Sequence, residues 1–179
     1  MATTYEAIAT TTVGSGGAAN IEFTSIPGTY TDLVLKVSVR DNRPTNVSQY
    51  LEISFNNSAS TYNIVDLYGN GINLTSSSTN DLGANKPYTY INAAGATAST
   101  FSNCEIYIPN YTSSNAKSFS IDSITENNGA SVYPANTLAG LHAARWSGTS
   151  AITSIKLLGY NSTTLQQHST ATLYGIKNS

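Results

Sequence analysis

The chain has 179 residues, of which only 10% are charged, and its formal net charge is −2. Ordinary globular proteins carry about 25% charged residues. The basic residues form no cluster that could neutralise a row of phosphates, so nucleic-acid binding is not expected. No run of about 18 apolar residues could span a bilayer, and residues 1–6 lack the charged and apolar regions of a signal peptide. We therefore expect synthesis in a host cytoplasm and no membrane partner.

Alternation of apolar and polar residues predicts a series of short strands. The longest alternation lies in 30–40, where the apolar residues at every second position are Leu33, Leu35, Val37 and Val39. It is typical of a strand with one buried face, and we expect it to be the central strand of an antiparallel sheet. The predicted strands, in chain order, are 5–13, 20–26, 30–40, 47–56, 62–68, 88–92, 101–109, 118–126, 137–146, 151–160 and 170–177.

Two connections and one ambiguous segment separate these strands. Residues 69–86 lose the alternation and are predicted to be a long polar loop, which in a compact domain is usually functional. Residues 93–99 are predicted to be a loop as well. In 137–146, the spacing of Leu138 and Leu141 fits a helix, but the all-β surroundings favour a strand.

About eleven short strands without a confident helix predict an all-β fold, an antiparallel two-sheet sandwich that resembles a jelly roll. We expect one domain over 1–179, because a chain of this length buries roughly 70% of its unfolded surface and needs no disulfide or metal. The single cysteine, Cys104, lies on the apolar side of its strand and is expected to be a buried, inert thiol.

Candidate catalytic residues are sparse. His142 and His168 have no ligand partner at zinc spacing, and no GxSxG nucleophile motif is present. Glu105, Asp122 and Glu126 fall at outward positions of neighbouring predicted strands, where a carboxylate pair could hydrolyse a glycoside. A solvated strand face is the preferred interpretation of these three. We therefore predict no enzyme activity, cofactor or metal site.

Aromatic residues give the strongest hint of function, since the chain has 12 tyrosines and one tryptophan. Tyrosine is enriched where one side is apolar and the other wet, as at protein interfaces and sugar-binding platforms. Ordinary cross-strand pairing of aromatics is the alternative interpretation. The candidate interface residues are Tyr62, Tyr68, Tyr88, Tyr90, Tyr107, Tyr111, Tyr133 and Trp146, and the tyrosines among them are predicted to lie at edges or outward positions.

Five stretches carry a family resemblance: IPGTYTDLVL at 26–35, ISFN at 53–56, IYIPNY at 106–111, AITSI at 151–155 and ATLYGI at 171–176. Their order and spacing resemble a group of virion structural proteins of tailed bacteriophages. These stretches are strand cores and turns, so the resemblance covers nearly the whole chain but includes no catalytic motif.

The resemblance implies a location on the virion and two alternative functions. The favoured one is a capsid cement or decoration protein that binds the major capsid protein or other virion proteins, commonly as a homotrimer. The alternative is a tail or fibre module that binds host carbohydrate through exposed tyrosines and the 69–86 loop. The absence of a repeated or fibrous segment favours the first. A polysaccharide hydrolase is a third, weaker alternative.

Overall fold

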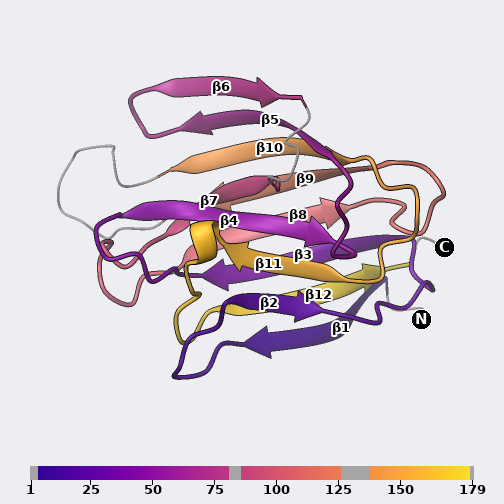
Figure 1. The fold of residues 1–179 in the computed structure, drawn as a ribbon, viewed down its shortest axis with the longest axis horizontal. Coiled ribbons are helices and arrows are strands. Elements are labelled where there is room, and N and C mark those ends of the chain that lie inside the picture. Colours follow the sequence, from indigo (N-terminus) through magenta and orange to yellow (C-terminus); the bar gives the residue numbers. More distant parts are fainter. Residues whose placement is uncertain (1–3, 81–85, 126–137, 178–179) are drawn as a thin grey trace.

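Two antiparallel sheets pack face to face in the computed structural model, which describes residues 4–80, 86–125 and 138–177 (Figure 1). The larger sheet has eight strands in the order β1-β12-β3-β8-β9-β10-β5-β6, and the smaller has four in the order β2-β11-β4-β7. In Figure 1 the small sheet lies in front, and the large sheet extends beyond it at β5 and β6. This architecture confirms the predicted all-β sandwich.

Most strand bounds follow the predicted segments closely, but β2 and β11 are shorter than the strands predicted at 20–26 and 151–160. The large sheet consists of β1 (Tyr5–Thr12), β12 (Thr170–Ile176), β3 (Asp32–Val39), β8 (Ser102–Ile108), β9 (Lys117–Ile124), β10 (Ala139–Trp146), β5 (Tyr62–Gly69) and β6 (Leu74–Thr79). The small sheet consists of β2 (Asn20–Phe23), β11 (Ile155–Gly159), β4 (Ser48–Phe55) and β7 (Tyr88–Asn92). A 3-10 turn, η2 (Tyr160–Ser162), follows β11. None of the described helical segments has the length and apolarity needed to cross a membrane.

Strand β3 is central, as its alternation predicts, because it lies between β12 and β8 in the large sheet. Leu35 is opposite Leu173 on β12 and Ile106 on β8, and all three side chains are fully buried. Fully burying one such side chain stabilises the fold by about 1.5–3 kcal/mol. This inner row therefore anchors the sandwich.

The core also takes in three of the aromatic residues that we predicted to serve an interface, so the outward placement of Tyr62 and Tyr111 is wrong. Tyr62, Tyr111 and Trp146 are each at most 2% exposed. Phe55 makes edge contacts with Trp146 at 5.7 Å and Phe119 at 5.0 Å between ring centroids. The Tyr62 hydroxyl accepts the backbone N–H of Phe55 at 2.9 Å. Large rings fill the space between the two sheets, and their polar tips satisfy buried backbone groups.

Part of the predicted 69–86 loop is a strand. β6 pairs with β5 along its length, with Thr79 opposite Ile64 at one end and Leu74 opposite Gly69 at the other. In the turn between them, the Asn70 side chain accepts hydrogen bonds from the backbone N–H groups of Ile72 and Asn73. Every residue of β6 is exposed. A strand with no buried face leaves no alternation in the sequence, which explains why the pattern missed it.

The ambiguous segment 137–146 is a strand over its described part, as the all-β surroundings predicted. In β10 the side chains alternate strictly, with His142, Ala144 and Trp146 buried and Leu141 exposed. The residues 137 and Tyr133 lie outside the described ranges.

Candidate functional site

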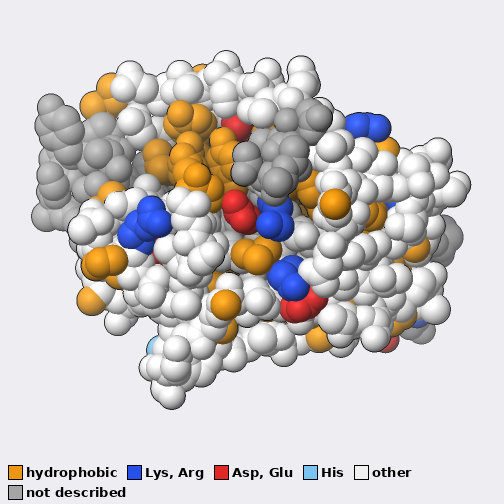
Figure 2. Space-filling view, in the orientation of Figure 1, with side chains coloured by type: hydrophobic (Ala, Val, Ile, Leu, Met, Phe, Trp, Pro, Cys, Tyr) orange, Lys and Arg blue, Asp and Glu red, His pale blue; other side chains and the backbone are white. Residues whose placement is uncertain are grey.

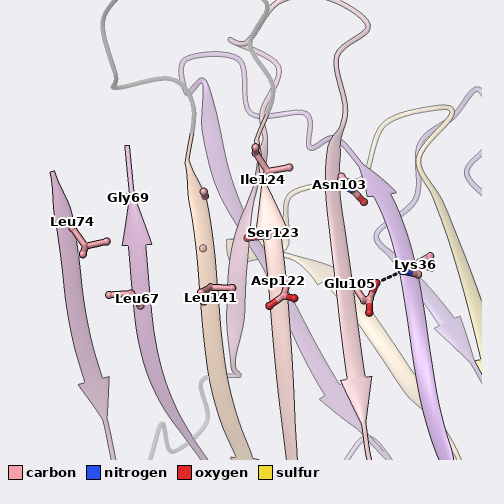
Figure 3. A pocket seen from close by; sticks show the side chains of 12 residues that line it. Lys36, Leu67, Gly69, Leu74, Asn103, Glu105, Asp122, Ser123, Ile124 and Leu141 are labelled. Carbon is pink, nitrogen blue, oxygen red and sulfur yellow. Dashed lines mark hydrogen bonds and ion pairs between the residues drawn. The ribbon is translucent and has the colours of Figure 1, made fainter. Parts of the chain in front are cut away.

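The outer face of the large sheet carries an exposed group of aliphatic side chains, which we call the aliphatic face. Its members are Val65 (57% exposed), Leu67 (40%), Leu74 (74%), Ile124 (47%) and Leu141 (56%). They come from the adjacent strands β6, β5, β10 and β9 and point to the same side in Figure 3 where labelled. Monomeric soluble proteins rarely expose a large contiguous apolar patch without an interaction to serve.

This face is hollowed. A groove of about 520 Å³ lies between the aliphatic side chains of β5, β6, β9 and β10 and a polar end formed by Lys36, Glu105 and Asp122 (Figure 3). A second hollow of about 470 Å³ is lined mainly by residues of β5, β8, β9 and β10, including Ser120 and Ala143. Small side chains at the middle of these strands leave room that a neighbouring molecule could fill.

The polar end contains two of the predicted carboxylates. Glu105 and Asp122 are directly opposite each other across β8 and β9, as the predicted neighbouring strands require. Lys36 forms an ion pair with Glu105, and both side chains are exposed. Asp122 makes no ion pair or hydrogen bond with the residues that the structure describes. Glu126 lies outside the described ranges. This arrangement fits a solvated strand face with one carboxylate available to a partner.

Five half-buried tyrosines form a second candidate surface, which we call the tyrosine shelf. Its members are Tyr50 on β4, Tyr68 on β5, Tyr88 and Tyr90 on β7, and Tyr160 in η2. Ring centroids lie 4.6 Å apart for Tyr50–Tyr88, 5.2 Å for Tyr50–Tyr90 and 5.1 Å for Tyr68–Tyr90. Tyr160 meets Tyr50 edge-on at 5.4 Å. Figure 2 shows hydrophobic side chains gathered at the step between the small sheet and the projecting part of the large one.

A buried polar network lies beneath the shelf. His142 Nδ1 is 2.6 Å from Asp66 Oδ1, and His142 Nε2 is 3.1 Å from Thr89 Oγ1. The Thr89 hydroxyl donates to Ser123 Oγ at 2.6 Å. The network joins β5, β10, β7 and β9, and therefore couples the two sheets next to the shelf. The second carboxylate oxygen of Asp66 accepts the Tyr88 hydroxyl at 3.4 Å.

The order of carboxylate, imidazole and hydroxyl in this network matches that of a catalytic triad. Thr89 is 0% exposed, however, and Asp66 and His142 are at most 3% exposed. A substrate carbonyl could reach the Thr89 hydroxyl only if the two sheets separated. We therefore interpret these side chains as a structural network that fixes the position of Tyr88.

Burial changes the acidity of the shelf. It raises the pKa of Tyr88 to about 12, with the Asp66 carboxylate as the next cause. It also raises the pKa of Tyr90, with Tyr50 and Tyr68 adding to the effect. A tyrosine is already neutral at physiological pH, and the raised pKa keeps both hydroxyls protonated further into the alkaline range. Burial also raises the pKa of Glu52, which is directly opposite Tyr88 on β4, against the opposing effect of Lys86.

The structure brings together only some of the predicted interface residues. Tyr68, Tyr88 and Tyr90 meet in the shelf, whereas Tyr107 lies on the outer face of β8, where its hydroxyl donates to Asp32 at 2.9 Å. Tyr50 was missed, although its position opposite Tyr90 and between two buried residues of β4 is the signal that could have found it.

The aliphatic face was also missed from the sequence. In β5 and β10, the exposed residues Val65, Leu67 and Leu141 alternate with buried ones. Where both sides of a strand carry apolar residues, the sequence pattern does not show which side packs against the other sheet. Among the described residues no three His, Cys, Asp or Glu side chains lie close enough together to hold a metal ion. No family model, curated protein or solved structure matches this chain.

Proposed function

We propose that this protein is a non-enzymatic structural protein of a tailed-phage virion, a cement or decoration protein whose aliphatic face docks on the major capsid protein. The exposed aliphatic face is the observation that carries the proposal. The sequence resemblance to virion proteins supplies the partner class.

The chemistry of the face favours a protein partner. Its exposed side chains are branched aliphatics, which pack into the hydrophobic pockets of another protein, whereas sugars stack on aromatic rings. Fully burying a Leu side chain contributes about 1.5–3 kcal/mol, so covering Leu67, Leu74 and Leu141 would supply much of a docking energy. The available carboxylate of Asp122 at the end of the groove favours a partner with a Lys or Arg at the matching position.

The low charge of the chain suits this role, because few ionised groups would have to be desolvated when the protein docks. In the proposed role, three copies on the shell would bridge neighbouring capsid subunits. A homotrimer in solution is compatible with the proposal but is not required by it, since assembly could occur on the capsid alone.

Replacing two apolar residues of the aliphatic face with charged ones tests the proposal. Leu67 and Leu141 are directly opposite each other on β5 and β10. The double variant Leu67→Glu/Leu141→Lys places opposite charges across the two strands, which preserves the sheet while removing apolar contact. The matched control is Tyr5→Lys, which alters an exposed hydrophobic residue (49% exposed) at the far edge of the same sheet.

The measurement is cosedimentation with virus particles assembled without the protein, followed by immunogold electron microscopy. We expect the wild type and Tyr5→Lys to bind and to label the head shell, and the double variant to bind at least about tenfold more weakly, a loss of about 1.4 kcal/mol. Equal binding by the folded double variant, or label confined to the tail tip, would contradict the proposal.

A further inference from the structure

We propose that the tyrosine shelf is a binding site for neutral carbohydrate, located on the opposite side of the sandwich from the aliphatic face. This inference does not depend on the proposed docking function, because different residues carry it. Most shelf residues belong to the small sheet or to η2, and Tyr68 of β5 points to the opposite face of its strand from Leu67. A molecule with both surfaces would attach through the large sheet and present the shelf outward.

Three rings of the shelf occupy outward positions of the small sheet. Tyr50, Tyr88 and Tyr90 occupy the outward positions of β4 and β7, since Leu51, Thr89 and Ile91 between them are fully buried. Outward positions of a solvated antiparallel sheet usually carry polar side chains. A concentration of aromatic rings at one step of the surface therefore requires an explanation.

The rings of the shelf are tilted against one another. The planes of Tyr50 and Tyr90 are tilted by 50°, and those of Tyr68 and Tyr90 by 52°. These side chains keep part of their surface exposed. The negative face of an aromatic ring attracts the polarised C–H groups on the flat side of a pyranose. The shelf thus offers a row of adjoining, partly exposed aromatic rings to an oligosaccharide.

Polar groups border the rings of the shelf. The hydroxyl oxygens of Tyr88 and Tyr90 can accept hydrogen bonds from a ligand, while the Tyr88 hydroxyl donates its own proton to Asp66 at 3.4 Å. Glu52 stands beside Tyr88 with its side chain 16% exposed, and Lys86 is 3.9 Å from it. Ligand sites combine an apolar surface with a few placed polar groups that fix orientation. Because Glu52 is paired with Lys86, this pair adds little net charge to the shelf, which is why we specify neutral carbohydrate.

A buried hydrogen-bond network holds the shelf in place before any ligand binds. The Asp66 carboxylate is hydrogen-bonded to both His142 and Tyr88 and has only 2% of its surface exposed. Fully satisfied polar networks in a protein interior make the side chains that they join rigid. A shelf whose rings are fixed before binding loses less entropy when the ligand arrives.

The test is binding to an array of neutral hexose and N-acetylhexosamine oligosaccharides. We expect the wild type to bind a subset of these, Tyr50→Ala and Tyr90→Ala to lose at least about tenfold in affinity, and Tyr90→Phe to lose less because it keeps the ring. The matched control is Tyr107→Ala, which removes an exposed tyrosine from the other sheet face and should bind as the wild type does.

A second measurement protects the test from misfolded variants. The bound oligosaccharide, titrated into the wild type, should shift the ring resonances of Tyr50, Tyr88 and Tyr90 in NMR spectra and leave those of Tyr107 unchanged. No binding by the wild type to any neutral glycan, or shifts centred on Tyr107, would overturn the inference. The variant Leu67→Glu/Leu141→Lys should keep its glycan affinity, which separates this inference from the docking proposal.

Discussion

Removing the Asp66 carboxylate should destabilise the protein far more than removing the exposed Asp122 carboxylate from the outer face of the same sheet. In the wild type, Asp66 accepts hydrogen bonds from His142 Nδ1, from the Tyr88 hydroxyl and, at 3.1 Å, from the Ser77 hydroxyl. All three groups lose their acceptor in Asp66→Ala. His142 has a side chain that is 0% exposed, so water cannot replace the lost partner without opening the sandwich. Asp122→Ala is the matched control, because Asp122 is exposed.

The expected magnitude follows from this geometry. Leaving a buried polar group without a partner costs about 1–3 kcal/mol, and three groups lose their acceptor here, so we expect a loss of about 3–5 kcal/mol, a large part of the 5–15 kcal/mol typical of a domain. Asp66→Asn keeps the shape and one acceptor oxygen, so we expect a smaller loss, about 1–3 kcal/mol. Asp122→Ala should change the free energy of unfolding by no more than about 0.5 kcal/mol.

Urea denaturation followed by circular dichroism measures these differences, with an unchanged slope as the sign that the folded and unfolded states stay comparable. Asp66→Ala should also weaken glycan binding, because Tyr88 loses its partner. If Asp66→Ala and Asp122→Ala unfold within about 1 kcal/mol of each other, the reasoning about a buried supporting network is wrong.

Three further predictions concern stability and reactivity. The buried Arg40 guanidinium donates five hydrogen bonds to the 94–100 segment. Arg40→Ala should therefore lower the free energy of unfolding, measured by urea denaturation, by about 3 kcal/mol or more. The control Arg145→Ala, at an exposed position, should change it by about 0.5 kcal/mol at most. Burial raises the pKa of the Cys104 thiol to about 12, and only 1% of the residue is exposed; a thiol-specific reagent at neutral pH should therefore label it only after unfolding, and rapid labelling of the native protein would contradict its placement. Because the pKa of Tyr88 and of Tyr90 is higher in the folded than in the unfolded chain, the unfolded chain loses protons first above pH 10 or so, and stability should fall from there to about pH 12; Tyr88→Phe should make that fall shallower in unfolding measurements across this range.

The strands of the core were predictable because they have one buried face. β3 shows this best, since its four inward apolar residues alternate with side chains that are mostly polar. β6 was not predictable, because the small sheet does not reach it and neither of its faces is buried. Alternation records what is covered, so it is silent for a strand that nothing covers.

The candidate surfaces depend on register and on the unequal widths of the two sheets. Tyrosines near 88–90 could be proposed from the sequence, but their contact with Tyr50 exists only because β4 pairs with β7 in one register. The Asp66–His142 pair joins residues 76 positions apart, and no local motif marks it. Tyr62 and Trp146 were misassigned because tyrosine and tryptophan suit both a wet interface and a large core space.

The measurement that tests the central claim most directly is site-specific photo-crosslinking within assembled particles. A photoreactive residue replaces Leu141 on the aliphatic face in one sample, and exposed Asn57, beyond the end of β4, in another. We expect position 141 to become covalently joined to the major capsid protein, as mass spectrometry would identify, and position 57 not to. Crosslinks from position 57 alone, or none to any virion protein from position 141, would contradict the docking proposal.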